Sequence, residues 1–333
     1  MNRVRLQRFL SRNSYLFALL LLVIALGINY YLQDNLFEMR VLNRNLRVFL
    51  PLMILAVGQA IVIIGGGIDL SVGAMVSMCN AIIATRITSD SAAVEIIGAI
   101  LLACGAGVLA GALNGFSVAY LRLQPIVTTY ATSFIYSGLA LLILPRPGGD
   151  IPRHMTDFYR STPANIPIAV YAAVIILLLW YVLRSTRYGQ YLYATGDNTT
   201  AAYTTGVPVG TVKFSTYVAS GFIAAISALA LTLSLGSGSP RIGDNMTLES
   251  IVAVVLGGTR LSGGQGGIAG ALIGVVILGI IRNIISFANV PTWSQTLVDA
   301  LIIVSALAAP GLVRLISTQV NRFRVNNRQE EYA

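Results

Sequence analysis

Apolar residues run along this chain in long stretches that are separated by short polar segments. A helix needs about 20 mostly apolar residues to cross the hydrocarbon of a bilayer, and fewer where it is broken. Ten stretches reach or approach that length, near residues 15–32, 48–66, 70–87, 94–119, 125–144, 166–184, 213–236, 246–258, 267–286 and 296–314. The eighth is short and ends in glycines, which is typical of a half-helix. The pattern predicts an all-α integral membrane protein with about ten transmembrane helices, some of them broken.

The composition agrees with a membrane location and excludes a soluble domain. Hydrophobic residues make up 56% of the 333 residues and charged residues only 11%, with a mean hydropathy of +0.76. A water-facing surface would need roughly 25% charged residues. The net charge of +9 does not indicate nucleic acid, because the basic residues lie between apolar runs and in the tails. Cys79 and Cys104 lie in apolar stretches and behave as small hydrophobic residues, and the single histidine, His154, excludes a multi-histidine metal site.

Basic residues predict the orientation of the spans, because loops rich in arginine and lysine stay in the cytoplasm. With the amino terminus inside and ten alternating spans, 13 of the 22 basic residues fall on the inner side and nine on the outer side. The arginine cluster at 40–47 falls outside and fits this orientation least. We predict cytoplasmic tails at 1–14 and 315–333 and a single transmembrane domain at 15–314, whose first helix is retained and not cleaved as a signal peptide.

Two connecting loops are long enough to have structure of their own. The outer loop, 145–167, carries five prolines, and this density predicts that it contains no regular helix. The inner loop, 185–212, has a stretch near 198–203 that could hold one or two helical turns, with Asp197 or Asn198 as the amino-terminal cap. A capped helix in so long an inner loop indicates a functional element.

Asp69 is the one ionisable residue inside the apolar core, within the sequence GGGIDLSVGA. A carboxylate inside a bilayer costs about 2.5–3.5 kcal/mol on insertion scales, so it needs a compensating role. Asp69 could line a substrate path or relay protons. It could instead cap the helix that begins at Leu70 and Ser71 and satisfy the amides of its first turn. Of the two, the sequence favours the cap.

Glycines interrupt the apolar pattern at two places and predict broken helices there. The first break lies just before Asp69, and the second is LGGTRLSGGQGG at 256–267. The glycines of the two breaks are Gly65, Gly66, Gly67, Gly257, Gly258, Gly263 and Gly264. The second break is not a phosphate loop, because that motif requires a lysine and the only lysine is Lys213. The chain is therefore expected to hydrolyse no nucleotide, and a tight membrane hairpin explains the second break.

Hydroxyl side chains follow one another along the fifth apolar stretch. Thr128, Thr132 and Tyr136 recur at helical spacing and therefore share a face. Together with Asp69 and Ser71 they are the candidates for the path of a neutral polar solute. Hydroxyls that bond the backbone of their own helix would give the same pattern, and the sequence does not choose between the two. No span carries paired carboxylates at helical spacing and no HExxH motif occurs, so no catalytic site and no metal site are predicted.

Three segments together resemble the permease subunits of bacterial sugar ABC importers, the ribose/galactose-type family. They are GGGIDLSVGA (65–74), TRYGQYLYATGDNTTAAYTTGVPV (186–209) and LESIVAVVLGGTRLSGGQGGIAGALIGVVILG (248–279), and their order and spacing fit over essentially the whole chain. The resemblance implies a type II importer fold of ten helices per subunit, working as a dimer in the bacterial inner membrane. The partners implied are an ATPase subunit that holds ATP and Mg²⁺, a soluble substrate-binding protein, and a second permease copy or a sister permease. No cofactor is implied on this chain.

The resemblance also implies a role for the inner loop. In the family, the loop between the sixth and seventh spans forms a coupling helix that docks in a cleft of the ATPase. Carried over to this sequence, that role falls on Gly196, Asp197, Asn198, Thr199, Ala201, Ala202 and Gly206. The family usually has two small residues before the asparagine, where this chain has Gly196 and Asp197, and this departure bears on the details of the ATPase contact. The implied substrate is a monosaccharide.

An alternative from another class is a self-sufficient, proton-coupled transporter that uses Asp69. Uptake by such a protein would collapse with an uncoupler and would need no ATPase. A single buried acid without a second acidic or a basic partner in a span is a weak basis for a proton relay. The outer loop 145–167, with Arg146, Arg153 and Arg160, could dock the binding protein or could simply be a solvated loop.

Overall fold

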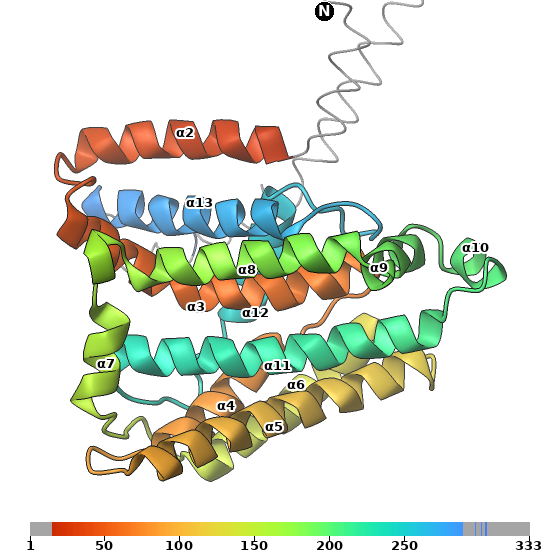
Figure 1. Ribbon diagram of the computed structural model, residues 1–333, viewed down its shortest axis with the longest axis horizontal. Helices are drawn as coiled ribbons and strands as arrows, with labels where there is room; N and C mark the ends of the chain where they lie inside the picture. Colours follow the sequence, from red (N-terminus) through yellow and green to blue (C-terminus); the bar gives the residue numbers. More distant parts are fainter. Residues whose placement is uncertain (1–14, 289–296, 298–300, 302–303, 305–333) are drawn as a thin grey trace, which may run out of the picture. The chain divides into compact units, whose positions relative to one another are not determined.

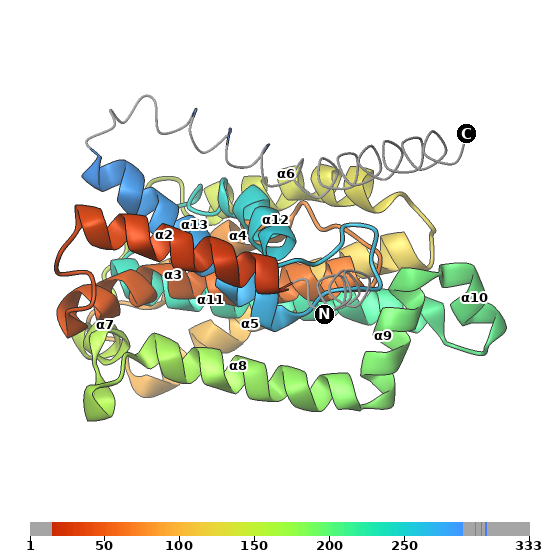
Figure 2. The same cartoon turned by 90° about the horizontal axis from the view of Figure 1, so that it is seen from above.

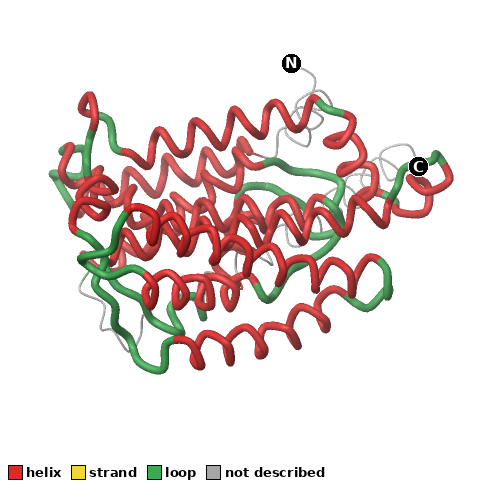
Figure 3. The backbone as a smooth tube through the Cα atoms, turned by 60° about the horizontal axis from the view of Figure 1, so that its bottom comes forward, coloured by secondary structure: helices red, strands yellow, loops and turns green. Residues whose placement is uncertain are grey.

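The computed structural model describes residues 15–288 and positions 297, 301 and 304. The elements below all belong to one of the two units of the chain, Met1–Ala288. They are helices joined by loops, and the described residues form no strand beyond one isolated bridge (Figure 3). In order they are α2 (Tyr15–Leu32), α3 (Met39–Ile64), α4 (Val72–Arg86), α5 (Ala93–Ala119), α6 (Pro125–Ile143), α7 (Arg153–Arg160), η1 (Pro163–Asn165), α8 (Ile168–Ser185), α9 (Arg187–Asp197), α10 (Thr199–Thr204), α11 (Val209–Leu235), α12 (Met246–Leu256) and α13 (Ile268–Phe287).

Helices lie at nine of the ten predicted spans, and the tenth, 296–314, lies outside the described residues, as do the predicted tails. Six of the described helices are long and apolar enough to cross a membrane, namely α3, α5, α6, α8, α11 and α13. Three shorter apolar helices are Ala18–Leu32, Val72–Arg86 and Met246–Leu256. The described part of the chain therefore has the helices of a multi-pass membrane protein, with the eighth predicted span short as expected.

The predicted and observed helix limits differ most at the amino end of α3. The helix begins at Met39, well before the predicted start near 48, because the polar residues up to Arg47 form helical turns ahead of the apolar run. Pro51 lies inside the helix and does not end it. The residues from Leu50 to Ile64 are all buried, so α3 is a central helix along most of its length.

The helices α3 and α11 form the centre of the unit. α11 packs along α5 and α3, and α4 packs against α6, α11 and α5. Figure 1 shows α3, α8, α11 and α5 running side by side, with α7 crossing one end of them and α9 and α10 at the other end. The view from above shows the same two ends (Figure 2). The unit therefore has two distinct ends, defined by α7 and by α9–α10.

Glycines allow α5 and α11 to approach to backbone contact. A Cβ on Gly107 would meet the carbonyl oxygen of Gly221, and a Cβ on Gly111 would meet that of Tyr217. Neither contact leaves room for a side chain. Within a membrane such close backbone approach supplies the van der Waals packing that holds two helices together. This interface fixes the helix that carries Ser220 next to the helix that carries Asn114, two residues of the site described below.

The proline-rich outer loop contains a helix, contrary to the prediction. α7 begins directly after Pro152 and ends before Pro163. Proline disrupts the interior of a helix but is tolerated next to its first turn. The eight residues of α7 contain no proline, so the density of prolines over the whole loop was a poor guide to this short segment.

The inner loop contains two helices where the sequence predicted one. α10 agrees with the predicted short helix, whereas α9 was not predicted. The hydroxyl of Thr186 caps α9 by accepting the amide of Gly189 at 3.3 Å. The buried positions of α9 are Gly189, Leu192, Thr195 and Gly196, which recur at the period of a helix. Two glycines and few apolar residues hide this period in the sequence.

Candidate functional site

The three sequence motifs meet at one place, which we name the glycine junction and define as residues 64–67, 196–197 and 263–264. The first segment follows α3, the second ends α9, and the third lies in the loop after α12. The amide of Gly264 donates a hydrogen bond to the carbonyl oxygen of Ile64 at 3.0 Å. Motifs that lie far apart in the sequence therefore form a single contact between backbones.

Only glycine fits at the centre of this junction. A Cβ on Gly196 would meet the carbonyl oxygen of Ile64 and would lie 2.7 Å from the amide nitrogen of Gly264. Gly66 and Gly263 have φ angles of +83° and +86°, which side chains disfavour, and a Cβ on Gly263 would lie 2.8 Å from the Cα of Gly66. The structure also places Gly65 and Gly257 at the carboxyl ends of α3 and α12. The backbone of α9 is therefore in direct contact with both predicted helix breaks.

Side chains on both faces of α9 hold it against the rest of the unit. The hydroxyl of Tyr193 donates to the carbonyl oxygen of Gly266 at 2.7 Å, and the hydroxyls of Tyr188 and Ser215 lie 2.7 Å apart in a hydrogen bond. Burial raises the pKa of the Tyr193 hydroxyl, against an opposing effect of Arg184, so the hydroxyl keeps the proton that it donates. These bonds attach α9 to the loop after α12 and to α11. A movement of α9 therefore either carries this loop and α11 with it or breaks the bonds.

The short helix α10 projects from α9 at the end of the unit (Figure 1). Asn198 caps it, because its side-chain oxygen accepts the amide of Ala201 at 3.0 Å. Of the residues that the resemblance assigned to the ATPase contact, Asp197, Asn198, Thr199, Ala201 and Gly206 are exposed, whereas Gly196 and Ala202 are buried. Tyr203 on the same helix is also exposed, at 73%.

Asp69 lies in a buried hydrogen-bonded group that we name the Asp69 cluster. Its Oδ1 accepts the amide of Ser71 at 2.9 Å and the hydroxyl of Ser71 at 2.7 Å, and its Oδ2 accepts the hydroxyl of Ser220 at 3.2 Å. Asn114 donates to the hydroxyl oxygen of Ser71 at 2.8 Å, and Thr132 donates to Oδ1 of Asn114 at 2.7 Å. The cluster thus joins the segment before α4 to α5, α6 and α11.

The hydrogen bonds of the Asp69 cluster have a defined direction. Thr132 donates to Asn114, Asn114 to Ser71, and Ser71 to Asp69. Asp69 is an acceptor in all three of the bonds that it makes with Ser71 and Ser220. The residues of the cluster are at most 8% exposed. The expected cap is present in part: Asp69 accepts the amide of Ser71, the residue that precedes α4, and it also links two other helices.

The buried polar face of α6 keeps two of the three predicted residues, Thr132 and Tyr136, and has Thr129 in place of Thr128. Thr129, Thr132 and Tyr136 are buried, and the Thr129 hydroxyl accepts the amide of Leu70 at 2.9 Å. Tyr136 donates to the carbonyl oxygen of Ala110 at 2.9 Å.

Thr128 lies outside the cluster, and its hydroxyl donates to the carbonyl oxygen of Gln124 on its own helix at 2.9 Å. Four of the five residues predicted for the path therefore lie together, and Thr128 does not. Sequence reasoning missed Asn114 and Ser220, of which Asn114 is an amide inside an apolar span and could have been found.

The glycine junction and the Asp69 cluster adjoin along the chain. Gly67 and Asp69 are separated by a single residue, and a Cβ on Gly67 would lie 2.5 Å from the hydroxyl oxygen of Tyr217 on α11. Any displacement of α9 at the junction must therefore act on the segment that carries Asp69. Among the described residues no group of three or more histidine, cysteine, aspartate or glutamate side chains could hold a metal ion.

Comparison with known protein families identifies the class of this arrangement. The model of the permease component of branched-chain amino acid transport systems matches residues 41–307, which include the glycine junction, the Asp69 cluster and α10. The chain belongs to this family of permeases. The resemblance to import permeases that the three motifs indicated is therefore confirmed.

Individual relatives of this permease are import permeases as well. The ribose import permease protein RbsC of Haemophilus influenzae is 31% identical over 311 residues, which cover 91% of this chain and 94% of the relative. RbsC of Escherichia coli K12 is 32% identical over 88% of this chain and 90% of the relative. The autoinducer 2 import system permease protein LsrC of Yersinia pseudotuberculosis is 30% identical over 98% of this chain and 91% of the relative. No solved structure is significantly similar to this permease.

Proposed function

We propose that this permease is the membrane subunit of an ATP-driven importer of a monosaccharide or a similar small polar solute. The observation that carries the proposal is the glycine junction, where the α9–α10 segment touches the backbones that follow α3 and α12. A partner that pushes on α10 would act directly on the two broken helices. The relatives named for ribose and autoinducer 2 import support this class of solute.

In this proposal the chain supplies the path and a partner supplies the energy. A separate ATPase subunit binds ATP and Mg²⁺ and docks on α10, whose exposed residues include Asn198 and Tyr203. Closure of the ATPase displaces α10 and α9, and the glycine junction passes the movement to the segment with Asp69. The polar atoms of the Asp69 cluster bond one another, so a solute passes only after these bonds rearrange.

The remaining parts of the assembly follow from the same proposal. The chain forms a type II fold of about ten helices and pairs with a second copy or a sister permease in the bacterial inner membrane, among membrane lipids. The α9–α10 end faces the cytoplasm, as do both termini, and the α7 end faces outward, where a soluble binding protein delivers the solute. The family match and the import permeases among the relatives support this arrangement over a proton-coupled transporter that uses Asp69, for which no relative provides support.

A new positive charge on the exposed side of α10 is expected to uncouple transport. We expect Asn198→Arg and Tyr203→Arg to reduce ATP-dependent uptake to background while the protein stays in the membrane, because both side chains lie where the ATPase would dock. Tyr203 is preferred to Ala202, whose side chain is 4% exposed and where an arginine would bury its charge. The measurement is solute uptake into cells, normalised to the amount of inserted protein.

The matched control for these variants is Gln190→Arg. Gln190 is exposed on α9 in the same inner loop, but it lies two turns before α10. The control adds the same charge and should retain uptake. Normal uptake by both α10 variants would show that this surface carries no coupling contact.

A further inference from the structure

Three arginines lie on two segments that contact each other at the end of the unit that α7 crosses. Arg44 and Arg47 are three residues apart on α3 and therefore share a face, and Arg160 is the last residue of α7. Two hydrogen bonds join the segments: the Tyr159 hydroxyl donates to the carbonyl oxygen of Arg47, and the Asn43 side-chain amide donates to that of Arg160, each at 2.8 Å. These bonds place the positions of the three arginines next to one another.

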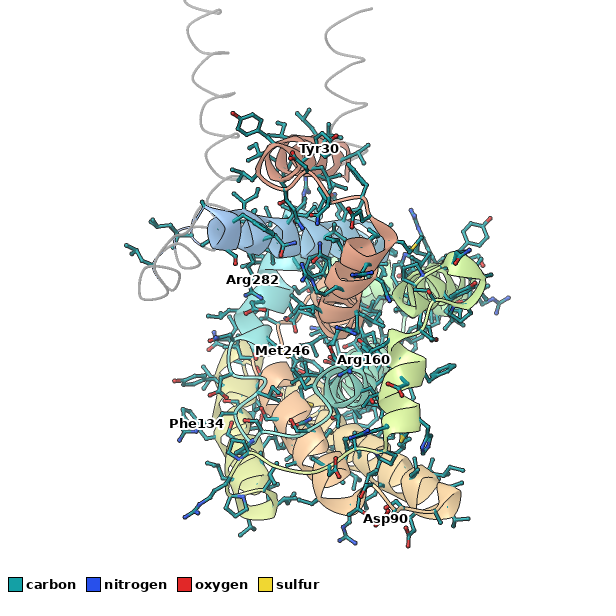
Figure 4. The ribbon with its side chains drawn as sticks, turned by 90° about the vertical axis from the view of Figure 1, so that its left-hand side faces the viewer. Tyr30, Asp90, Phe134, Arg160, Met246 and Arg282 are labelled. Atoms are coloured by element: carbon teal, nitrogen blue, oxygen red, sulfur yellow. The ribbon has the colours of Figure 1, made fainter. Side chains whose placement is uncertain are left out.

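No carboxylate forms an ion pair with these arginines within the described part of the chain. The ion pair found there joins Glu249 of α12 to Arg282 of α13, and Figure 4, which looks onto this end, labels Arg282 and Arg160 on different helices. The Nε atom of Arg47 is buried and has no hydrogen-bond partner among the described residues. An arginine group with a buried donor left open is arranged to receive an acceptor from outside the chain.

The position of Arg44 and Arg47 on α3 is unfavourable without an external ligand. In the orientation proposed above both residues lie on the outer side, where basic residues are disfavoured. Membrane orientation therefore does not account for them, and an anion bound there would offset this cost.

The side-chain pattern of α3 places this group at the boundary between lipid and water. Arg44 is exposed, and Val48, one turn further along the same face, is an exposed apolar side chain at 58%. On α7 the apolar ring of Phe158 is 66% exposed. Charged and apolar exposed side chains thus lie one turn apart at this end of the unit. Such a mixture is typical of the boundary between lipid and water, and lipid phosphates lie at that boundary.

We propose that Arg44, Arg47 and Arg160 form a binding site for a phosphate-type anion. Guanidinium groups bind phosphate through paired hydrogen bonds, and three of them match both the charge and the several oxygens of one phosphate. The phosphate can belong to a phospholipid headgroup or be free in solution, and both have the chemistry that the site recognises. The bound anion would tie α7 to α3 through charge, in addition to the two hydrogen bonds from Tyr159 and Asn43.

Native mass spectrometry of the full-length chain, purified in mild detergent from its own membranes, tests the site. The parent chain is expected to keep one tightly bound phospholipid that Arg47→Gln and Arg160→Gln lose, with about fivefold weaker retention for each arginine removed. Arg153→Gln is the matched control, because Arg153 is exposed on the same helix but lies at its opposite end from Arg160. This result assigns the site to lipid.

A second arm tests free phosphate on the delipidated chain. Inorganic phosphate should raise the Tm of the parent and of Arg153→Gln, but not of Arg47→Gln or Arg160→Gln, if the anion comes from solution. Without any anion the two glutamine variants should be at least as thermally stable as the parent, because they remove repulsion. The proposal is overturned if neither lipid nor phosphate distinguishes these variants from the control, or if the variants lose only the binding of an acidic soluble protein.

Discussion

Replacing Gly196 with alanine is expected to abolish transport and to destabilise the protein. The new Cβ would meet the carbonyl oxygen of Ile64 and the amide of Gly264, and these backbone groups cannot turn aside as a flexible side chain would. Overpacking of this kind costs about 3 kcal/mol at the upper end of its usual range. α9 would separate from the glycine junction, and movements of α10 would no longer reach the helix breaks. Solute uptake and the Tm of the purified protein measure the two effects.

The control for this prediction is Gly138→Ala on α6. No heavy atom lies within 4 Å of a Cβ at Gly138, and alanine favours a helix over glycine by up to about 1 kcal/mol. This variant should keep its uptake and should have an equal or higher Tm. If Gly196→Ala transports as well as Gly138→Ala, the close backbone contact at the junction is not needed for coupling.

Replacing Asp69 with leucine is expected to have the second large effect. The change leaves the amide and hydroxyl of Ser71 and the hydroxyl of Ser220 without their acceptor in a buried place. Each buried donor without a partner costs about 1–3 kcal/mol. Since α4, α5, α6 and α11 meet at this cluster, we expect a large drop in Tm and loss of uptake.

The variant Asp69→Asn separates the structural role of Asp69 from proton transfer. The amide oxygen of asparagine can accept from Ser71 as Oδ1 does, and its NH₂ group can donate to Ser220, whose hydroxyl then acts as the acceptor. We therefore expect substantial uptake, unaffected by an uncoupler while ATP is maintained. Complete loss of uptake in a variant as stable as the parent would instead favour a proton relay at Asp69.

Local patterns were sufficient to predict the helical class and the positions of most described helices. Long apolar runs gave the spans, because a helix in lipid has to satisfy its backbone internally and its side chains have to be apolar. The glycine breaks and the Asn198 cap were also local, since each depends on neighbours within one turn. The limits of α3 were predicted less well, because its first turns are polar and lie beyond the apolar run.

Contacts between distant segments were not predictable from the same patterns. The glycine junction depends on Gly66, Gly196 and Gly263, and no periodicity connects positions so far apart. Thr128 and Thr129 differ in burial because of the rotation of α6 against α4, which sequence spacing alone does not fix. α9 was missed because its buried face includes two glycines, and α7 was missed because flanking prolines masked eight proline-free residues.

The central claim is that α10 receives energy from an ATPase partner. The most direct measurement is purification of the tagged full-length chain from its native membranes in mild detergent, with the bound proteins identified and quantified by mass spectrometry. The proposed function predicts an ABC ATPase in stoichiometric amounts with the parent chain and its loss from the Tyr203→Arg variant. A folded chain that purifies without any ATPase, and that still takes up solute after reconstitution alone, would contradict it.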